Sequence, residues 1–321
     1  MSGDPVKVST LRLADTTAGQ EQAAEILRSG GLVAFATETV YGLGADATDP
    51  RAVAGIYAAK GRPAFNPLIA HVASVEAARR EGTFDAVAER LAAAFWPGPL
   101  TLVVPLASGA SVCELARAGL PSLALRIPAH EMARSILAAV GRPVAAPSAN
   151  RSGHVSPVDA AHVLGDLDGR IDAVLDSGRS PVGIESTIVA CLGGAPVLLR
   201  SGGIATADIV AVAGPLAPPA EGTIVAPGML TSHYAPATGL RLEAQMLEEG
   251  EAGLDFGARF GGRVLDLSPS GDTIEAAANL YQYLRRLDAG HPRRIAVAPI
   301  PTTGLGEAIN DRLRRAAAPR H

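Results

Sequence analysis

Apolar residues recur along the chain in two patterns that alternate from its N-terminal end. Residues 17–29 have the spacing of an amphipathic helix that Gly30-Gly31 ends, and the apolar run 32–36 has the length of a buried strand. Further apolar runs predict strands at 68–72, 100–106, 123–127, 144–146, 173–175, 187–191 and 197–199. Helices are predicted between them at 50–60, 85–95, 129–140 and 157–166. This alternation indicates an α/β fold with a large mixed sheet.

The pattern changes at residues 213–228, where four prolines and no helical period indicate an extended linker. Beyond it, strands are predicted at 241–242, 263–267 and 294–299, and helices at 272–287 and 306–317. This β-α-β-α order is Rossmann-like. The predicted parts are therefore a larger α/β domain at 1–212, a linker at 213–237 and a smaller C-terminal α/β domain at 238–321.

Composition narrows the function classes. A hydrophobic content of 48% excludes intrinsic disorder, and a net charge of −4 with 4% aromatics argues against a broad nucleic-acid face. Cys113 and Cys191 stand far apart without a CxxC spacing, which gives neither a disulfide framework nor a zinc site. Nowhere do about 18 apolar residues follow one another, so we expect a cytoplasmic protein without a signal peptide or membrane span.

The familiar nucleotide-binding and hydrolase signatures do not occur in the sequence. Gly42-Leu43-Gly44 and Gly304-Leu305-Gly306 both lack the third glycine of GxGxxG, and there is no GxxxxGK followed by Ser or Thr. HExxH and GxSxG are absent as well. A P-loop, a dinucleotide site, a zinc protease and an α/β-hydrolase are therefore not supported.

Polar side chains gather instead where apolar elements end, which is where ligands commonly bind in α/β proteins. The segment 37–44 follows the first strand, and its simpler interpretation is a capped turn. Lys60 and Arg62 follow a helix end, where cations also complement the helix dipole. The segment 147–153 offers hydroxyls, an amide and backbone N–H groups that suit a phosphate.

Three further residues each allow two interpretations. His71 lies in an apolar strand, where a histidine is either a satisfied core residue or a ligand. Arg126 and Arg200 close apolar strands, and an arginine in that position is either paired with an acid or held for an anion. The residues alone leave these alternatives open.

Together the motifs carry a family resemblance. In order along the chain they are TETVYGLG, KGRPAFNPLIAHV, WPGPLTLV, RIP, APSANRSG, ESTIV and LLRSGG. Their order and spacing resemble the YrdC-like threonylcarbamoyl-AMP synthases, and APGMLTSHYAP with the ending GLGEAINDRLRRAA resembles the long two-domain form. The similarity spans about residues 15–317. One departure is Ser201, where the family usually has proline.

The resemblance implies a YrdC-like catalytic domain at 1–212, with a large twisted mixed sheet and helices. It also implies that the linker at 213–237 serves as a lid and that 238–321 is a smaller Rossmann-like domain. It also implies a nucleotidyltransferase that makes L-threonylcarbamoyladenylate and pyrophosphate from L-threonine, bicarbonate or CO₂, and ATP with Mg²⁺. A separate transferase system would then use the product to modify the adenosine beside the anticodon of certain tRNAs.

Site residues follow from the resemblance position by position. The catalytic set that it implies is Lys60, Arg62, Ser148 and Asn150. The implied ATP contacts are these four together with Ser122, Ser156, Arg200, His233 and Tyr234. The implied threonine pocket is Thr37, His71, Arg126 and Ser186, with Arg126 on the carboxylate. His233 and Tyr234 would belong to a lid, and no side chain is assigned to a metal.

Two alternatives come from other classes. YrdC-like domains have been associated with RNA, so a binding module for double-stranded RNA or tRNA without catalysis is one; the net charge of −4 argues against it. A carbamoyl-transferring maturation enzyme of the hydrogenase type is the other, and it lacks the expected zinc-finger cysteines.

Overall fold

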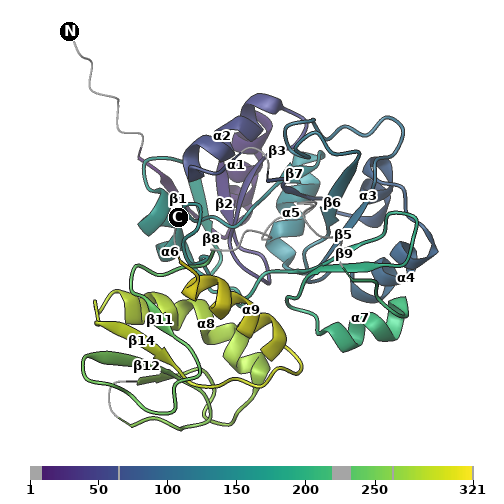
Figure 1. Ribbon diagram of the computed structural model, residues 1–321. Helices are drawn as coiled ribbons and strands as arrows, with labels where there is room; N and C mark the ends of the chain where they lie inside the picture. Colours follow the sequence, from purple (N-terminus) through teal and green to yellow (C-terminus); the bar gives the residue numbers. More distant parts are fainter. Residues whose placement is uncertain (1–8, 64–65, 219–232, 262–263, 320–321) are drawn as a thin grey trace.

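The computed structural model describes residues 9–63, 66–218, 233–261 and 264–319 (Figure 1). Within these residues the chain forms two units, each with its own sheet, which confirms the predicted α/β class. The ten strands of the larger sheet, in the order in which they lie side by side, are β1 (Leu11–Ala14), β8 (Ala173–Asp176), β2 (Val33–Phe35), β3 (Gly42–Asp46), β7 (Val144–Ala145), β4 (Ile69–His71), β6 (Ser122–Arg126), β5 (Leu100–Pro105), β9 (Thr187–Ala190) and β10 (Val197–Arg200).

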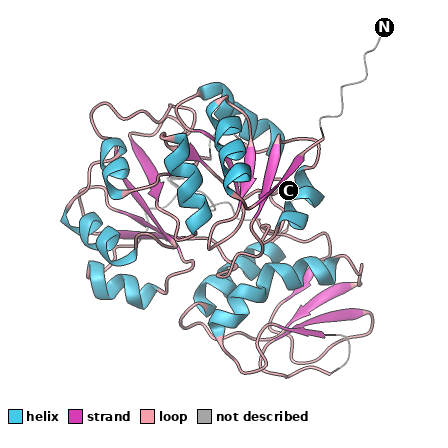
Figure 2. Ribbon diagram, turned by 180° about the vertical axis from the view of Figure 1, so that it is seen from behind, coloured by secondary structure: helices cyan, strands magenta, loops and turns pink. Residues whose placement is uncertain are grey.

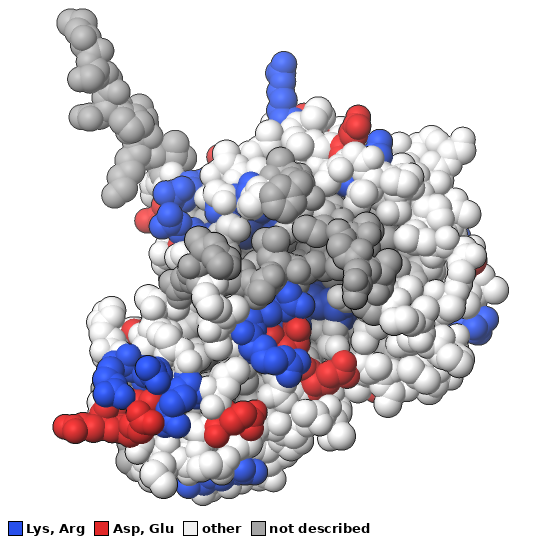
Figure 3. Space-filling model, viewed as in Figure 1, with Lys and Arg blue, Asp and Glu red and all other residues white. Residues whose placement is uncertain are grey.

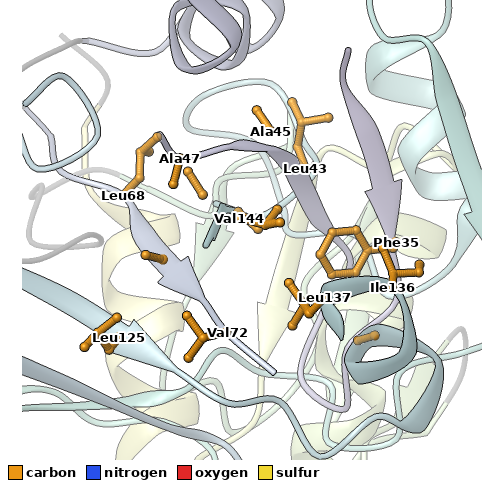
Figure 4. Close-up of a cluster of buried hydrophobic side chains, with 14 of the residues drawn as sticks. Phe35, Leu43, Ala45, Ala47, Leu68, Val72, Leu125, Ile136, Leu137 and Val144 are labelled. Carbon is orange, nitrogen blue, oxygen red and sulfur yellow. The ribbon is translucent and has the colours of Figure 1, made fainter. Parts of the chain in front are cut away.

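The larger sheet is mixed, because some neighbouring strands run parallel, as β4 and β6 do, and others antiparallel, as β5 and β6 do. The helices that pack around it are α1 (Thr17–Arg28), α2 (Pro50–Lys60), α3 (Val75–Glu81), α4 (Ala86–Phe95), α5 (Glu131–Val140), α6 (Ala160–Leu167) and α7 (Thr206–Ala213). Figure 4 shows part of the apolar core between sheet and helices, where Phe35 and Val144 on strands face Ile136 and Leu137 on α5.

Local chemistry explains the ends of helix α2, which delivers two predicted site residues. Asp49 caps its N-terminus by accepting from the backbone N–H of Arg51, and Pro50 occupies the first turn. Gly61 ends the helix at φ 59°, in the left-handed region that glycine adopts without strain. Lys60 is therefore the last helical residue.

Five elements of the larger unit differ from the sequence predictions. β3 was expected to be a loop; its small residues allow close packing, since a Cβ on Gly44 would lie 2.7 Å from Cε1 of Phe35. β1, α3 and α7 were not predicted. α6 begins at Ala160 rather than at 157, because Asp159 accepts from the N–H of His162 and caps the helix there.

The smaller unit has four parallel strands in the described residues. They lie in the order β11 (Leu240–Arg241), β14 (Arg294–Val297), β12 (Glu251–Asp255) and β13 (Val264–Asp266), and the helices are α8 (Thr273–Asp288) and α9 (Gly306–Ala317). β12 was not predicted because charged residues stand at both of its ends. It is nevertheless buried, and Arg241 neutralises Glu251 through two hydrogen bonds of 2.9 and 2.5 Å.

The helices of the smaller unit lie between its sheet and the larger unit (Figures 1 and 2). Val155, Val158 and Ile184 of the larger unit belong to the same buried cluster as Tyr281 of α8. Gly183 allows this approach, since a Cβ there would meet the carbonyl oxygen of Ala277 at 2.5 Å. The two units thus share apolar core.

Most of the predicted linker at 213–237 lies outside the described residues, which omit 219–232. α7 packs against α4 of the larger unit. At its other end the predicted linker is buried at His233 and Tyr234. The proposed boundaries at 212 and 238 stay predictions.

The charged surface, the helix lengths and the cysteines can be described for the residues that the structure covers. On the face in Figure 3, basic side chains lie among acidic ones. None of the helices in the described part of the chain is both long and apolar enough to cross a bilayer. Cys113 and Cys191 are free thiols.

Candidate functional site

A cavity lies where strands of the larger sheet meet the start of the smaller unit. Its described lining residues come from segments far apart in the sequence: Thr39, Val40, Arg62, Ile69, His71, Arg126, Ala146, Pro147, Ser148, Glu185, Ser186, Arg200, His233 and Tyr234. Eight of them were predicted from the sequence, namely Arg62, His71, Arg126, Ser148, Ser186, Arg200, His233 and Tyr234. The other predicted residues, Thr37, Lys60, Ser122, Asn150 and Ser156, are not among these lining residues.

Lys60 does not line the cavity but holds the backbone turn that carries the lining residue Ser148. Its buried ammonium donates to the carbonyl oxygen of Ser148 at 2.5 Å and to that of Asn150. Burial, with Arg62 as a second cause, holds the pKa of Lys60 well below its usual value. The Asn150 amide donates to the carbonyl oxygens of Arg151 and His154, each at 2.8 Å. Lys60 and Asn150 therefore fix the shape of the turn that presents Ser148.

Arg62 enters the cavity just beyond α2. Its Nη2 donates to the carbonyl oxygens of Asn66 and Pro67 at 3.4 and 3.2 Å, whereas its buried Nε has no hydrogen-bond partner among the described residues. Burial lowers the pKa of Arg62 to about 10. At neutral pH this side chain still carries a positive charge, with a donor left to offer an anion.

His71 and Arg126 lie side by side because β4 and β6 are parallel and pair these two residues in register. Burial, and then the charge of Arg126, lower the pKa of His71 to about 3, so its imidazole is neutral. Arg126 donates from Nη2 to Oε1 of Glu38 at 2.6 Å, in a buried ion pair. The sequence left two interpretations for Arg126, and the structure shows the one in which the arginine pairs with an acid. The paired guanidinium still lines the cavity.

Ser186 and Arg200 form a second fixed pair. Arg200 donates from Nε and Nη2 to the carbonyl oxygen of Ser186 at 3.1 and 2.8 Å, and from Nη2 to its hydroxyl at 3.1 Å. The Ser186 hydroxyl also contacts that of Thr101 at 2.7 Å. Burial lowers the pKa of Arg200. This network orients the serine hydroxyl on the cavity wall.

The segment that precedes β11 contributes two aromatic side chains. The rings of His233 and Tyr234 meet edge to face with centroids 4.2 Å apart, and Tyr234 has φ 62°. The backbone N–H of His233 donates to the carbonyl oxygen of Arg315 on α9 at 3.2 Å. Burial lowers the pKa of His233 to about 3, and its Nδ1 has no partner among the described residues.

The three remaining predicted residues, Thr37, Ser122 and Ser156, are not among the lining residues. The Thr37 hydroxyl donates to the carbonyl oxygen of Val40 at 2.7 Å and contacts the hydroxyl of Thr39 at 2.8 Å, so Thr39 takes the place on the cavity wall. Ser122 begins β6 on the same sheet face as Arg126 but four residues away. The Ser156 hydroxyl donates to Glu185 at 2.6 Å.

Three residues of the site with polar side chains escaped the sequence predictions: Glu38, Thr39 and Glu185. All three lie within the motifs TETVYGLG and ESTIV, beside residues that were chosen. The sequence offered one signal for the two glutamates, namely that each stands beside a residue predicted to bind substrate. Buried arginines need a counter-charge, and such an acid can supply it. As for metals, the described residues contain no group of three or more His, Cys, Asp or Glu side chains that could hold an ion.

Two family models match this chain. The model described as Telomere recombination, for Sua5, YciO and YrdC, covers residues 25–202, and the model described as Threonylcarbamoyl-AMP synthase, C-terminal domain, covers residues 204–318. A threonylcarbamoyl-AMP synthase of Pyrococcus abyssi is 41% identical over 322 residues, which span 92% of this chain and 93% of that protein. One from Bacillus subtilis is 39% identical, spanning 93% of each.

Among solved structures, that of P. abyssi Sua5 complexed with L-threonine has a TM-score of 0.88 at 37% identity and covers 96% of this chain and 97% of its own. Fold and cavity thus define a two-domain α/β protein whose cationic pocket lies on a large mixed sheet. More particularly, the chain belongs to the Sua5/YciO/YrdC family, in the long form with the Sua5 C-terminal domain. The resemblance drawn from the motifs is confirmed.

Proposed function

We propose that this chain is an L-threonylcarbamoyladenylate synthase. It would convert L-threonine, bicarbonate or CO₂, and ATP into L-threonylcarbamoyladenylate and pyrophosphate, for the threonylcarbamoyladenosine modification of tRNA beside the anticodon. The similarity over most of the chain to proteins named threonylcarbamoyl-AMP synthase supports this function. So does the threonine held by the P. abyssi relative.

The observation that carries the proposal is the set of three arginines around one cavity, Arg62, Arg126 and Arg200. The reaction must hold a triphosphate and an amino-acid carboxylate next to each other, and both are anions. Fixed guanidinium groups in a partly dry site stabilise such groups without reorganising during the reaction. A cavity with this charge suits an adenylation reaction better than hydrolysis of a neutral substrate.

On the nucleotide side, we assign Arg62 to the phosphates, with Ser148 as a hydrogen-bond partner. Lys60 and Asn150 act from behind the cavity wall in this structure, because their polar groups hold the turn at 148–150. Ser122, Ser156, Arg200, His233 and Tyr234 remain the other proposed nucleotide contacts.

On the amino-acid side, we assign Arg126 to the threonine carboxylate and Ser186 to another polar atom of the substrate. His71 would add a neutral wall here, since its imidazole carries no charge at neutral pH. Thr37 keeps its place in the proposed pocket through the turn that it forms with Thr39.

The chemistry requires positioning rather than a covalent nucleophile. The neutral threonine amine adds to CO₂ and loses a proton, giving a carbamate. A carbamate oxygen then attacks the α-phosphorus of ATP while the bond from that phosphorus to the β-phosphate bridging oxygen breaks, and pyrophosphate leaves. The arginines would hold both substrates in line and offset the charge on the phosphate oxygens.

Mg²⁺ would arrive with ATP and screen the negative charge of the leaving pyrophosphate. Glu185, the carboxylate among the described lining residues, is already bonded to Ser156, Tyr281 and Arg312. Phosphate oxygens are therefore the proposed ligands of the ion, and no protein side chain is assigned to it.

The decisive experiment measures pyrophosphate release by the purified chain with threonine, bicarbonate and Mg-ATP, and without RNA. Release should need all three substrates together, and mass spectrometry should find the threonylcarbamoyladenylate. A chain that releases no pyrophosphate but binds double-stranded RNA would instead be the binding module. We further propose that the product passes to the tRNA threonylcarbamoyl transferase system in the cytoplasm. The two free thiols support this compartment, because thiols stay reduced there.

A further inference from the structure

A buried arginine of the smaller unit approaches the cavity without lining it. Arg312 of α9 is 1% exposed. Its Nε donates to Oε2 of Glu185 at 2.9 Å and its Nη1 to Asp311 at 2.8 Å, while its Nη2 has no hydrogen-bond partner among the described residues. The guanidinium carbon lies 5.2 Å from the centroid of the Tyr234 ring.

Glu185 is the carboxylate with which Arg312 forms a buried ion pair. Its carboxylate accepts from the hydroxyl of Tyr281 on α8 at 3.0 and 2.8 Å, and from Ser156 at 2.6 Å. Burial raises its pKa, but the charges of Arg312 and Arg200 with the Ser156 hydrogen bond outweigh this, and the pKa of Glu185 is about 2. The carboxylate is therefore ionised at neutral pH.

An ionised carboxylate in the cavity wall would repel the proposed substrates, which are anions. Glu185 lines the same cavity as Arg62 and Arg200 and directly precedes Ser186. A triphosphate or an amino-acid carboxylate there would meet a like charge in a medium of low dielectric constant. Arg312 offsets the charge of Glu185 by pairing with it at 2.9 Å, and it does so from a different domain.

We infer that Arg312 is a positioning residue for ATP binding. It neutralises Glu185 and packs on Tyr234, so that the C-terminal domain completes the electrostatics of the pocket. This role rests on the proposed function, and its ligand is the polyphosphate of a nucleoside triphosphate. Tyr281 fixes the same carboxylate without adding a charge.

The test compares Arg312→Met, Glu185→Gln and the double variant. Methionine keeps much of the volume of the arginine but leaves Glu185 charged and unpaired. Calorimetry without threonine, so that no adenylate can form, should show the Kd of the ATP analogue AMPPNP raised about tenfold or more by Arg312→Met, as expected for a buried like charge beside an anion. In the double variant the Kd should return to within about threefold of Glu185→Gln, because the repelling charge is gone.

A purely structural role predicts a different pattern. The double variant would then bind AMPPNP as weakly as Arg312→Met, or more weakly, and the inference would be overturned. It would also be overturned if folded Arg312→Met bound AMPPNP within about twofold of the wild type. Arg314→Met, an exposed position on the same helix, is the matched control and should bind like the wild type.

Separate measurements report on folding and on the proposed function. Thermal melting shows whether each variant is folded; if Arg312→Met is not, Arg312→Lys decides, with a Kd near wild type expected and a tenfold loss counting against the inference. Pyrophosphate release by the wild type tests the proposed function on its own. Since AMPPNP binding needs no turnover, failure of one leaves the other measurable.

Discussion

Ser201 donates its hydroxyl hydrogen bond to Oε1 of Glu307 at 2.6 Å and thereby ties the end of β10 to the first turn of α9. Thr206 binds the other oxygen, Oε2, also at 2.6 Å. The motif comparison expected proline at position 201, which has no hydroxyl to donate. In this chain the serine adds a polar contact between the two domains.

Replacement of Ser201 by alanine should therefore destabilise the docked protein. Hydrogen bonds to a charged acceptor contribute about 1.5–3 kcal/mol, and partial exposure places this one near the lower end, at about 1.5 kcal/mol. Urea unfolding measures the change. Ser135→Ala, which removes an exposed hydrogen bond to Gln20, is the control and should stay within about 0.5 kcal/mol of the wild type. Equal effects of the two variants would contradict the assignment.

Lys60→Ala and Arg62→Ala should each lower turnover by about 10²-fold or more, since loss of a group that preorganises a phosphoryl site typically costs that much. The reasons differ: Arg62 lies on the cavity wall, whereas Lys60 holds the turn that presents Ser148. Pyrophosphate release measures turnover and circular dichroism checks the fold. Arg51→Ala, on the exposed side of α2, should be nearly neutral. Turnover within a few-fold of wild type in either variant would reject its role.

Arg126→Ala should weaken threonine binding much more than ATP binding, as calorimetry can measure. The structure adds a second effect, because the variant leaves Glu38 buried without its 2.6 Å partner, and breaking such a pair costs about 3–5 kcal/mol. Arg126→Ala with Glu38→Gln should regain stability but not threonine affinity. Equal loss for both ligands would move Arg126 to the nucleotide side.

Apolar runs and turn residues made most strands of the larger sheet and most helices predictable, because a buried strand is marked by an apolar run such as 100–106. β12 could not be found this way, because Glu251 is acceptable there only with Arg241 beside it. The same limit applies to the site. Sequence motifs identify Arg62 and Ser148 as site candidates. The contact between Arg312 and Glu185, 127 residues apart, arises only when the two domains pack together.

Acid should destabilise the protein through buried histidines. The pKa of His71 is about 3 in the folded state because of burial, against an ordinary value of about 6.5. Between these values the unfolded chain binds a proton that the folded chain does not, so stability falls as the pH drops below about 6.5, by up to about 1.4 kcal/mol per pH unit. Urea unfolding at pH 7.5 and 5.5 should show a shallower slope for His71→Gln. An unchanged slope would contradict the buried neutral state.

His233 and Tyr234 reach the cavity from beyond the larger unit. Because the rings of His233 and Tyr234 line it while the backbone of His233 is bonded to α9, we expect this segment to cover bound ATP and threonine and keep water from the labile adenylate. His233→Ala should then lower turnover by about tenfold or more and raise the fraction of adenylate that is hydrolysed. A larger loss should follow deletion of residues 213–321, which also uncovers Val155, Val158 and Ile184.

The point variant is the cleaner test, because the deletion exposes apolar surface and removes the partners of Glu185 at the same time. Pyrophosphate release and the ratio of intact adenylate to its hydrolysis products are measured together for His233→Ala. His291→Ala, at an exposed loop of the smaller unit, is the matched control. A His233→Ala protein that keeps the turnover and the product ratio of the wild type would show that the segment merely connects the two domains.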